Sequence, residues 1–296
     1  MISQRIQQFD AYLRFQCRRS SHTVDAYIRD THQFVALTGL TDLNHVSDTV
    51  IHAYLEALHN RAYSHTSIYR KIVALSQFWR FLIQANHVDK NPWAPIRRPK
   101  PHRHIPSHLE ESRVMELLHN YPESTVMDKR NKAILAVLLC SGIRVSELTT
   151  LTRSAIDSHN AICRIHGKGN KTRMALLGPR AMRHIQDYLN HAANEWPLPR
   201  HDYVFYAKSG TPLTVRSIQR IVKKANQFHS ADSVITPHGC RHTCANLLIS
   251  NGAPMRDVQE FLGHSSILST ERYTHIPNKH LTETFLRHIS PPTSSE

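Results

Sequence analysis

Residues 92–106, PWAPIRRPKPHRHIP, decide how this chain of 296 residues is divided. The stretch contains five prolines, at positions 92, 95, 99, 101 and 106. Because proline lacks a backbone donor and disfavours helix in the residue before it, this stretch cannot form regular structure. We therefore predict a linker at 92–106 that joins a domain at 1–91 to a second domain at 107–296.

The same linker is strongly basic. It carries four cations and no acid: Arg97, Arg98, Lys100 and Arg103. One interpretation is a solvated linker, and the other is a basic strap that lies against phosphates while it joins the two domains. The charge of the whole chain favours the strap.

Lysine and arginine total 37 against 23 acidic residues, which gives a formal net charge of +14 and a pI near 9.8. Such an excess favours a polyanionic partner, either nucleic acid or an anionic membrane surface. No apolar run approaches the length that a bilayer requires, and the start, MISQRIQQFDAYLRFQ, is too polar for a secretory signal. We therefore expect a cytoplasmic protein that binds nucleic acid and not a membrane.

Before the linker, apolar side chains recur at helical spacing. Ser21, Ser47 and Ser64 precede three such runs and can act as helix N-caps. The aromatic residues follow the helical period, so we expect them in the core of a four-helix domain. The basic residues are expected at polar positions: Arg18, Arg19, Arg29, Arg61, Arg70 and Lys71.

After the linker the pattern is mixed. Two apolar segments, 161–165 and 173–177, flank the sequence GKGNKT and predict a β-hairpin. Helices are expected at 108–119, 128–140, 144–151, 179–194, 215–228, 241–250 and 256–262. The fold class is therefore mainly α with a small antiparallel β-sheet.

Arg144 is a first candidate for chemistry because it directly follows the apolar run AILAVLLCSGI. A cation in this place either stabilises a helix C-terminus, which is the commoner case, or is held for a ligand. Glu147 lies one turn further on and could orient it. Three more polar residues, His238, Arg241 and His242, open another apolar helix.

The segment HGCRHTC at 238–244 also raises the question of zinc. His238 with His242, and Cys240 with Cys244, are each four residues apart, so a helix would place each pair on one face. The two pairs lie on different faces, and all four side chains cannot close one tetrahedron. The sequence also lacks a Walker A loop and an acidic cluster for a magnesium-dependent nuclease. We therefore expect no metal ion and no cofactor.

Five segments resemble, in order and in spacing, the consecutive motifs of the tyrosine recombinase (phage integrase) family: SGIRVSEL (141–148), GKGNKTR (167–173), PHGCRHTCAN (237–246), LGHSS (262–266) and YTH (273–275). The pattern SxxTxxxY at 20–27 and the Asn-Pro pair at 91–92 resemble the family's helical core-binding domain. The similarity spans nearly the whole chain and is closest to compact Xer-type members. Cys240 stands where leucine is usual and Ser141 where threonine is usual, and neither change removes a functional group.

The resemblance implies an N-terminal helical core-binding (SAM-like) domain and a C-terminal catalytic domain that form a C-shaped clamp on DNA. It implies six catalytic residues, with Glu147 as a supporting acid: Arg144, Lys168, His238, Arg241, His264 and Tyr273. DNA contacts are expected from six basic residues of the linker and the hairpin: Arg97, Arg98, Lys100, Arg103, Lys171 and Arg173.

The chemistry explains these residue types. Two guanidinium groups can hold a phosphodiester transition state bidentately without a metal ion. Tyr273 would attack as its phenolate and form a 3′-phosphotyrosine, with His238 as a plausible base. Lys168 could protonate the leaving 5′ oxygen, and His264 would hydrogen-bond the phosphate. Lys171 is a rival for the lysine role, as Tyr203 and Tyr206 are for the nucleophile.

The motif pattern favours a site-specific recombinase that acts as a tetramer on two duplexes and passes through a Holliday junction. A type IB topoisomerase would share the tyrosine chemistry but act as a monomer, and a catalytically silent DNA-binding module would not need every one of these side chains. The expected partners are double-stranded DNA with a specific recombination site and further copies of the chain, with a second recombinase or an activating protein left open. Chromosome-dimer resolution, mobile-element integration and transposon resolution all fit.

The C-terminus carries a further apolar stripe. Residues 278–289 follow Pro277 and predict a short helix with Leu281, Phe285 and Ile289 spaced by four. Such a stripe needs an apolar surface, which could belong to its own domain. The resemblance implies another surface, that of a neighbouring protomer, and so a tail that docks in trans.

Overall fold

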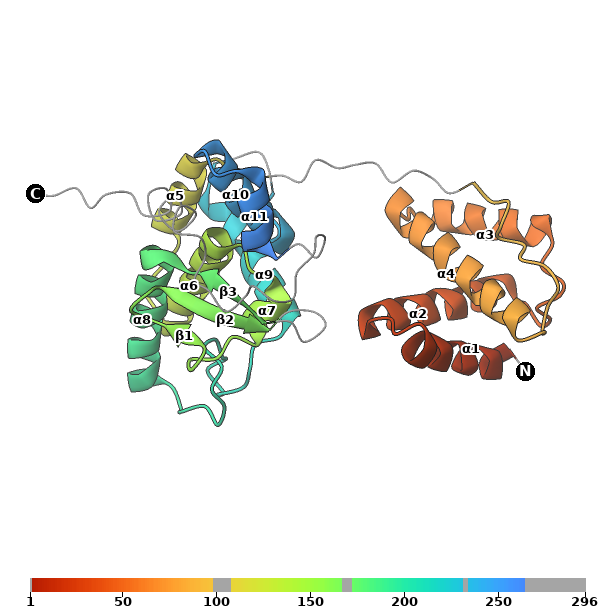
Figure 1. Ribbon diagram of the computed structural model, residues 1–296, viewed down its shortest axis with the longest axis horizontal. Helices are drawn as coiled ribbons and strands as arrows, with labels where there is room; N and C mark the ends of the chain where they lie inside the picture. The colour runs from red at the N-terminus through yellow and green to blue at the C-terminus, as the bar shows by residue number, and fades with distance from the viewer. Residues whose placement is uncertain (1, 98–107, 167–171, 231–233, 264–296) are drawn as a thin grey trace, which may run out of the picture. The chain divides into compact units, whose positions relative to one another are not determined.

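The computed structural model describes residues 2–97, 108–166, 172–230 and 234–263. The chain separates into two compact units, Met1–His104 and Ile105–Glu296 (Figure 1), each with its own hydrophobic core. Both units are dominated by helices, and the second also contains a three-stranded antiparallel sheet. The fold class expected from the sequence is confirmed.

The N-terminal unit is a four-helix domain. Ser47 and Ser64 cap the third and fourth helices as expected, because their hydroxyls accept the N–H groups of Val50 and Ser67 at 3.4 and 3.3 Å. The second helix ends at Gly39, whose φ is +63°. The helices are α1 Ile2–Ala11, extended by a π-turn at Tyr12–Gln16, then α2 Ser21–Thr38, α3 Asp48–Asn60 and α4 His65–Gln84.

Aromatic side chains fill the core of this unit, as their helical spacing predicts. Phe34 meets the rings of Tyr54, Trp79 and Trp93 edge-on, with ring centroids 5.0–5.7 Å apart. Trp93 lies inside the predicted linker and is fully buried. Its backbone N–H is held by the Asn91 carboxamide at 3.0 Å, so the start of the proline-rich stretch packs on the helical core.

Lys71 is buried, although the sequence predicted a polar position for it. Its ammonium group donates to Asp30 Oδ1 at 2.8 Å and lies 4.8 Å from the centre of the Tyr63 ring. Arg70 also pairs with Asp30, and Gln33 also contacts Lys71. The expectation was wrong because helical periodicity does not report a counter-charge on a different helix.

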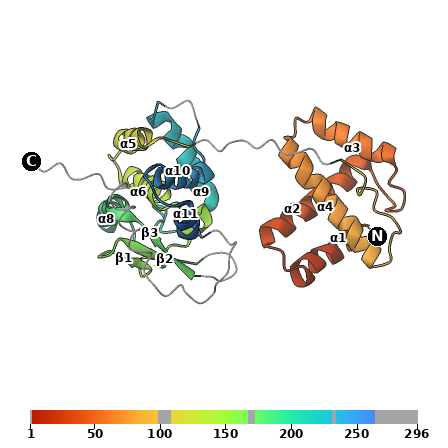
Figure 2. The ribbon, with the colours of Figure 1, turned by 45° about the horizontal axis from the view of Figure 1, so that its top comes forward.

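The C-terminal unit is built around α6, Val126–Ser141, which is buried along nearly its whole length. Thr125 and Asp128 form a capping box at its start, which accounts for a helix beginning two residues before the expected position. Both views place α6 between α8 on one side and α9 on the other (Figures 1 and 2). The remaining helices are α5 Glu111–Asn120, α7 Val145–Thr149, α8 Gly178–Glu195, α9 Val215–Ala225, α10 Pro237–Ser250 and α11 Met255–Leu262.

The sheet has the strand order β1-β2-β3, with β1 Ile156–Asp157, β2 Ile162–His166 and β3 Thr172–Leu176. Strands β2 and β3 form the expected hairpin, in a register that pairs Arg164 with Met174. Strand β1 was not predicted from the sequence, because two residues are too short to show an alternating pattern. None of the described helices combines the length and apolar character that spanning a membrane requires.

Helix α10 starts four residues earlier than expected. The Thr236 hydroxyl caps it by accepting the Gly239 N–H at 3.0 Å, and Pro237 occupies the first turn, where its missing N–H costs no hydrogen bond. His238 and Arg241 are therefore on the same helix, three residues apart. This places both side chains near one end of α10.

Candidate active site

Arg144 lies in the turn between α6 and α7, at the N-cap of α7. Its guanidinium Nη1 donates to Glu147 Oε1 at 2.9 Å, and its backbone N–H donates to Glu147 Oε2 at 2.8 Å. The Arg144 side chain is 44% exposed, whereas the Glu147 side chain is 3% exposed. Glu147 therefore orients Arg144 through both its backbone N–H and its guanidinium, which is still partly exposed to solvent.

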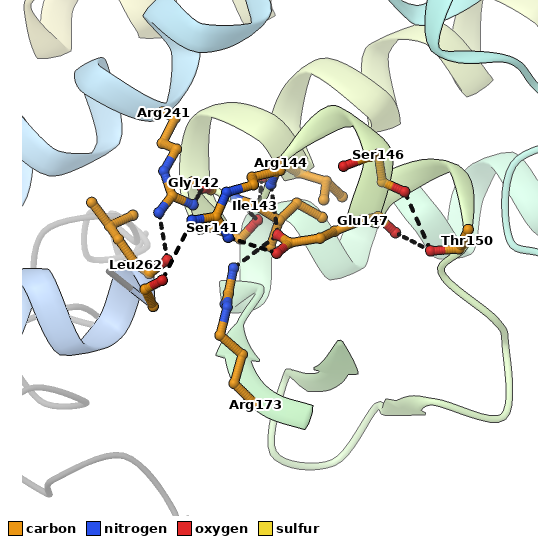
Figure 3. A network of polar contacts seen from close by, with 12 residues as sticks. Ser141, Gly142, Ile143, Arg144, Ser146, Glu147, Thr150, Arg173, Arg241 and Leu262 are labelled. Atoms are coloured by element: carbon orange, nitrogen blue, oxygen red, sulfur yellow. Dashed lines mark hydrogen bonds and ion pairs between the residues drawn. The ribbon is translucent and has the colours of Figure 1, made fainter. Parts of the chain in front are cut away.

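Arg241 comes from α10 and is buried. Its Nη1 donates to the carbonyl of Gly142 at 2.7 Å, and its Nη2 donates to the carbonyl of Leu262. These carbonyls lie at the C-terminal ends of α6 and α11, where helix dipoles favour a cation (Figure 3). Arg241 thus joins the ends of two helices to α10.

His238 lies one turn before Arg241 and is exposed. Its Nε2 is 2.9 Å from Nε2 of His242, and the two rings meet edge-on with centroids 4.4 Å apart. One of these nitrogens must carry the proton and the other must accept it. The neighbouring His242 therefore influences which His238 nitrogen can act as a base.

Arg144, His238 and Arg241 line one hollow of about 340 Å³. Ile143, Val145, Gln219, Thr236 and Pro237 complete its wall. Two cations from separate segments, with a histidine beside them, thus converge on one surface depression. This arrangement suits an anion with several oxygens, such as a phosphodiester.

A third arginine belongs to the same network. Arg173 on β3 donates through Nη2 to Glu147 Oε2 at 2.9 Å, and its side chain is 13% exposed. Figure 3 shows the guanidinium groups of Arg173 and Arg144 both reaching the carboxylate of Glu147. The structure places Arg173 inside the domain beside Glu147, and its expected contact with DNA stays a prediction.

The network has an excess of positive charge among the described residues, because Arg144 and Arg173 both pair with Glu147 and the charge of Arg241 lies close to them. Burial, together with the charges of Arg144 and Arg173, lowers the pKa of Arg241 from 12.5 to about 10. Burial also lowers the pKa of Arg173, and Glu147 opposes that effect. Arg241 remains protonated at neutral pH, and a bound anion would relieve the repulsion among the three cations.

Several predicted site residues lie outside the described residues: Lys168, Lys171, His264, Tyr273, Arg98, Lys100 and Arg103. Arg97 is described and exposed. The C-terminal stripe at 278–289 also falls outside the described ranges. The structure therefore brings together Arg144, Glu147, His238 and Arg241, and the other roles stay predictions.

The two rival tyrosines, Tyr203 and Tyr206, both lie in structured parts of the C-terminal unit. Tyr206 is buried and meets the ring of Tyr188 at a tilt and that of Trp196 edge-on, and Tyr203 forms an isolated β-bridge with Thr152. Cys240 and Cys244 are fully buried, whereas the His238–His242 pair lies toward solvent. The histidine pair and the cysteine pair therefore lie on different faces of α10, as expected.

Two features of this site are not visible in the sequence pattern. The backbone carbonyls that hold Arg241 have no side-chain signature, so no residue pattern could reveal them. The pairing of Arg173 with Glu147 joins residues 26 positions apart. The sequence indicates this pairing only by the position of Arg173 at the start of the otherwise mostly apolar strand β3.

Two models of known protein families match the chain. A model described as the phage integrase family matches residues 107–280, and one described as phage integrase, N-terminal SAM-like domain, matches residues 6–86. The chain is 36% identical over 290 residues to tyrosine recombinase XerC of Lacticaseibacillus casei (strain BL23), which covers 96% of this chain and 97% of that protein.

Two solved structures extend the comparison. The XerA recombinase is 26% identical, with a TM-score of 0.50, and the match covers 96% of this chain and 98% of that one. The integrase of the Tn1549 transposon, in complex with circular intermediate DNA, has a TM-score of 0.70 at 19% identity, covering 94% of this chain and 97% of that one. At that identity the second match shows a shared fold.

Proposed function

Because the chain belongs to the phage integrase family and is a site-specific tyrosine recombinase, we propose that Arg144, His238 and Arg241 hold one phosphodiester of duplex DNA for attack by Tyr273. The observation that carries this proposal is the convergence of the two arginines and the histidine on one hollow. The excess positive charge of the network supports an anionic ligand there.

The arginines differ in what they contribute. Arg241 is anchored through two N–H groups to the carbonyls of Gly142 and Leu262, which leaves three of its five donors for phosphate oxygens. Arg144 is held by Glu147 at its backbone N–H and at Nη1, and its side chain is 44% exposed. A rigid inner donor and a more accessible outer donor can bind two non-bridging oxygens, whose charge increases in the transition state.

In the proposed first step, the Tyr273 oxygen forms a bond to phosphorus while the bond from phosphorus to the 5′ oxygen breaks. The phenol proton passes to His238, which is helped because the cationic site favours the phenolate. Lys168 gives a proton to the leaving 5′ oxygen, and His264 donates a hydrogen bond to the phosphate. The 3′-phosphotyrosine keeps the energy of the phosphodiester, so the reverse step can join a new strand without ATP.

Double-stranded DNA with a specific recombination site is the proposed partner. The two domains would close around the duplex, with the basic strap at 92–106 against its phosphates. Four protomers would exchange strands between two duplexes through a Holliday junction, and the C-terminal tail would dock on a neighbouring protomer. The full-length similarity to XerC supports a recombinase over a topoisomerase.

A suicide substrate tests the nucleophile. We expect the unmodified chain to form a covalent adduct on a nicked duplex, and Tyr273→Phe to bind the same duplex with unchanged affinity but to form no adduct. Tyr203→Phe is the matched control and should keep the adduct. Denaturing gel electrophoresis reads the result, and an adduct that persists in Tyr273→Phe would assign the attack to another residue.

The same assay tests the metal-free chemistry. EDTA should leave adduct formation unchanged, because the proposed charge stabilisation comes from arginines. Loss of the adduct in EDTA, with recovery on adding zinc or magnesium, would contradict the proposal.

A further inference from the structure

Arg173 is a buried cation on strand β3 with an incomplete set of partners. Its Nη2 donates to Glu147, but its Nε and Nη1 are buried and have no hydrogen-bond partner among the described residues. Burying an arginine with unsatisfied donors lowers the stability of the fold. An apolar side chain of similar volume could fill the same space without that free-energy penalty. The cost suggests a role beyond packing.

The contacts of Arg173 connect three parts of the domain. It belongs to the β2–β3 hairpin, it holds Glu147 on α7, and it packs against Gly263 at the end of α11. A Cβ atom on Gly263 would lie only 2.8 Å from Cδ and from Nε of Arg173. Arg144 also reaches this point, because its Nη2 lies 3.4 Å from the Gly263 carbonyl.

Glu147 is the shared element. Its Oε1 accepts from Arg144 Nη1, whereas its Oε2 accepts from both the Arg144 backbone N–H and Arg173 Nη2. The carboxylate is therefore held in one rotamer from two sides. Without Arg173, Oε2 would lose its only side-chain donor in the described residues, and Glu147 could rotate and take the Arg144 guanidinium with it.

We propose that Arg173 is a positioning residue for the recombination reaction, which acts through Glu147 to hold Arg144 in the geometry that binds the scissile phosphate. This inference rests on the proposed function of the Arg144–His238–Arg241 site. Arg173 is not placed on the phosphate, because its side chain is 13% exposed, points to Glu147 (Figure 3) and is not among the residues that line the hollow.

The test compares Arg173→Met with Arg164→Met. Methionine approximates the length of arginine without its charge, and Arg164 is an exposed arginine on the adjacent strand of the same hairpin. We expect Arg173→Met to slow single-turnover cleavage of a suicide substrate by about 10- to 100-fold. Arg164→Met should cleave at the unmodified rate.

Two readouts separate positioning from other roles. The slope of log affinity against log salt should be unchanged in Arg173→Met, whereas the loss of a phosphate contact would flatten it by about 0.9. A substrate with sulfur in place of the leaving 5′ oxygen needs no proton, so a defect in placing the hairpin lysine would disappear on it. We expect the defect to persist, because Arg173 acts through Arg144.

A double-mutant cycle with Glu147→Gln tests the route of the effect. If Arg173 acts through Glu147, the double variant should cleave at about the rate of the slower single variant, whereas independent roles would multiply the two defects. Arg173→Lys keeps the buried charge without the planar fork and should recover part of the rate. If thermal denaturation shows that Arg173→Met is unfolded, Arg173→Lys takes its place in the test.

Multiplied defects, a flattened salt slope, recovery on the sulfur substrate, or a normal rate in the folded variant would each overturn the positioning role. These outcomes are distinguishable from failure of the proposed function. If the unmodified chain forms no adduct at Tyr273, the proposed function fails. If the adduct forms and Arg173 variants behave normally, only this inference fails.

Discussion

Replacing Gly142 by alanine should displace Arg241, because it disturbs the packing beneath this side chain. The substitution removes no polar group. Gly142 ends α6 in the left-handed region, with φ +59°, and its carbonyl accepts Arg241 Nη1 at 2.7 Å. A Cβ atom there would lie 2.7 Å from Leu262 Cδ2 and 3.2 Å from Cys244 Sγ. Leu262 is 3% exposed and Cys244 is fully buried, so neither side chain can swing into solvent.

The magnitude has two parts. An L-residue in the left-handed conformation costs about 1–2 kcal/mol, and inserting a methyl group into a packed core costs about 1–3 kcal/mol more. We therefore expect Gly142→Ala to lower the free energy of unfolding by about 2–5 kcal/mol. Since Leu262 must move, and its carbonyl is the second anchor of Arg241, the cleavage rate should also fall by about 10- to 100-fold.

Two other glycines serve as controls for the cost of the left-handed backbone conformation alone. Gly39 ends α2 with φ +63°, nearly the same backbone conformation, and Gly252 has φ +88° in the same unit as Gly142. A Cβ on either of them would meet no atom within 4 Å. Alanine at each control should cost only about 1–2 kcal/mol and leave cleavage unchanged.

Hydrogen exchange measured by mass spectrometry can report each unit separately, with peptides from α6 for Gly142 and from α2 for Gly39. Adduct formation on a suicide substrate gives the cleavage rate. One result would contradict this reasoning: Gly142→Ala destabilises its unit no more than Gly252→Ala does and cleaves at the unmodified rate. The packing of Gly142 against Leu262 and Cys244 would then not position Arg241.

Asp30→Asn should lower the free energy of unfolding of the N-terminal unit by about 3–5 kcal/mol, because it leaves the buried Lys71 without its counter-charge. Asp25→Asn, whose side chain is 59% exposed and pairs with Arg14, should cost less than about 1 kcal/mol, and equal losses in urea titrations would contradict this ranking. Neutralising the four linker cations, Arg97, Arg98, Lys100 and Arg103, should flatten the slope of log DNA affinity against log salt by up to about 0.9 for each residue. An unchanged slope would show that the linker does not contact phosphates. Truncation after Pro277 should leave a folded protein that binds a half-site but lacks cooperative binding to the full site, and retained cooperativity in a gel-shift titration would favour docking within one protomer.

Local chemistry along the sequence was enough to predict the two-domain organisation and most elements. Five prolines between 92 and 106 disfavour helix and sheet through their own backbone chemistry, and Ser47 and Ser64 satisfy helix N–H groups a few residues away. The same holds for the β2–β3 hairpin, which joins neighbouring segments through a short loop. The candidate arginines and histidines were recognised through motifs in order, each of which is a short stretch of contiguous residues.

Only the tertiary structure decided how those residues are held. Arg241 is anchored by backbone carbonyls of Gly142 and Leu262, and every residue has a carbonyl, so no side-chain pattern marks them. The burial of Lys71 and of Arg173 depends on carboxylates that the chain brings from 41 and 26 residues away. Periodicity describes one helix or strand at a time, whereas the free energy of a buried charge is set by whichever distant segment packs against it.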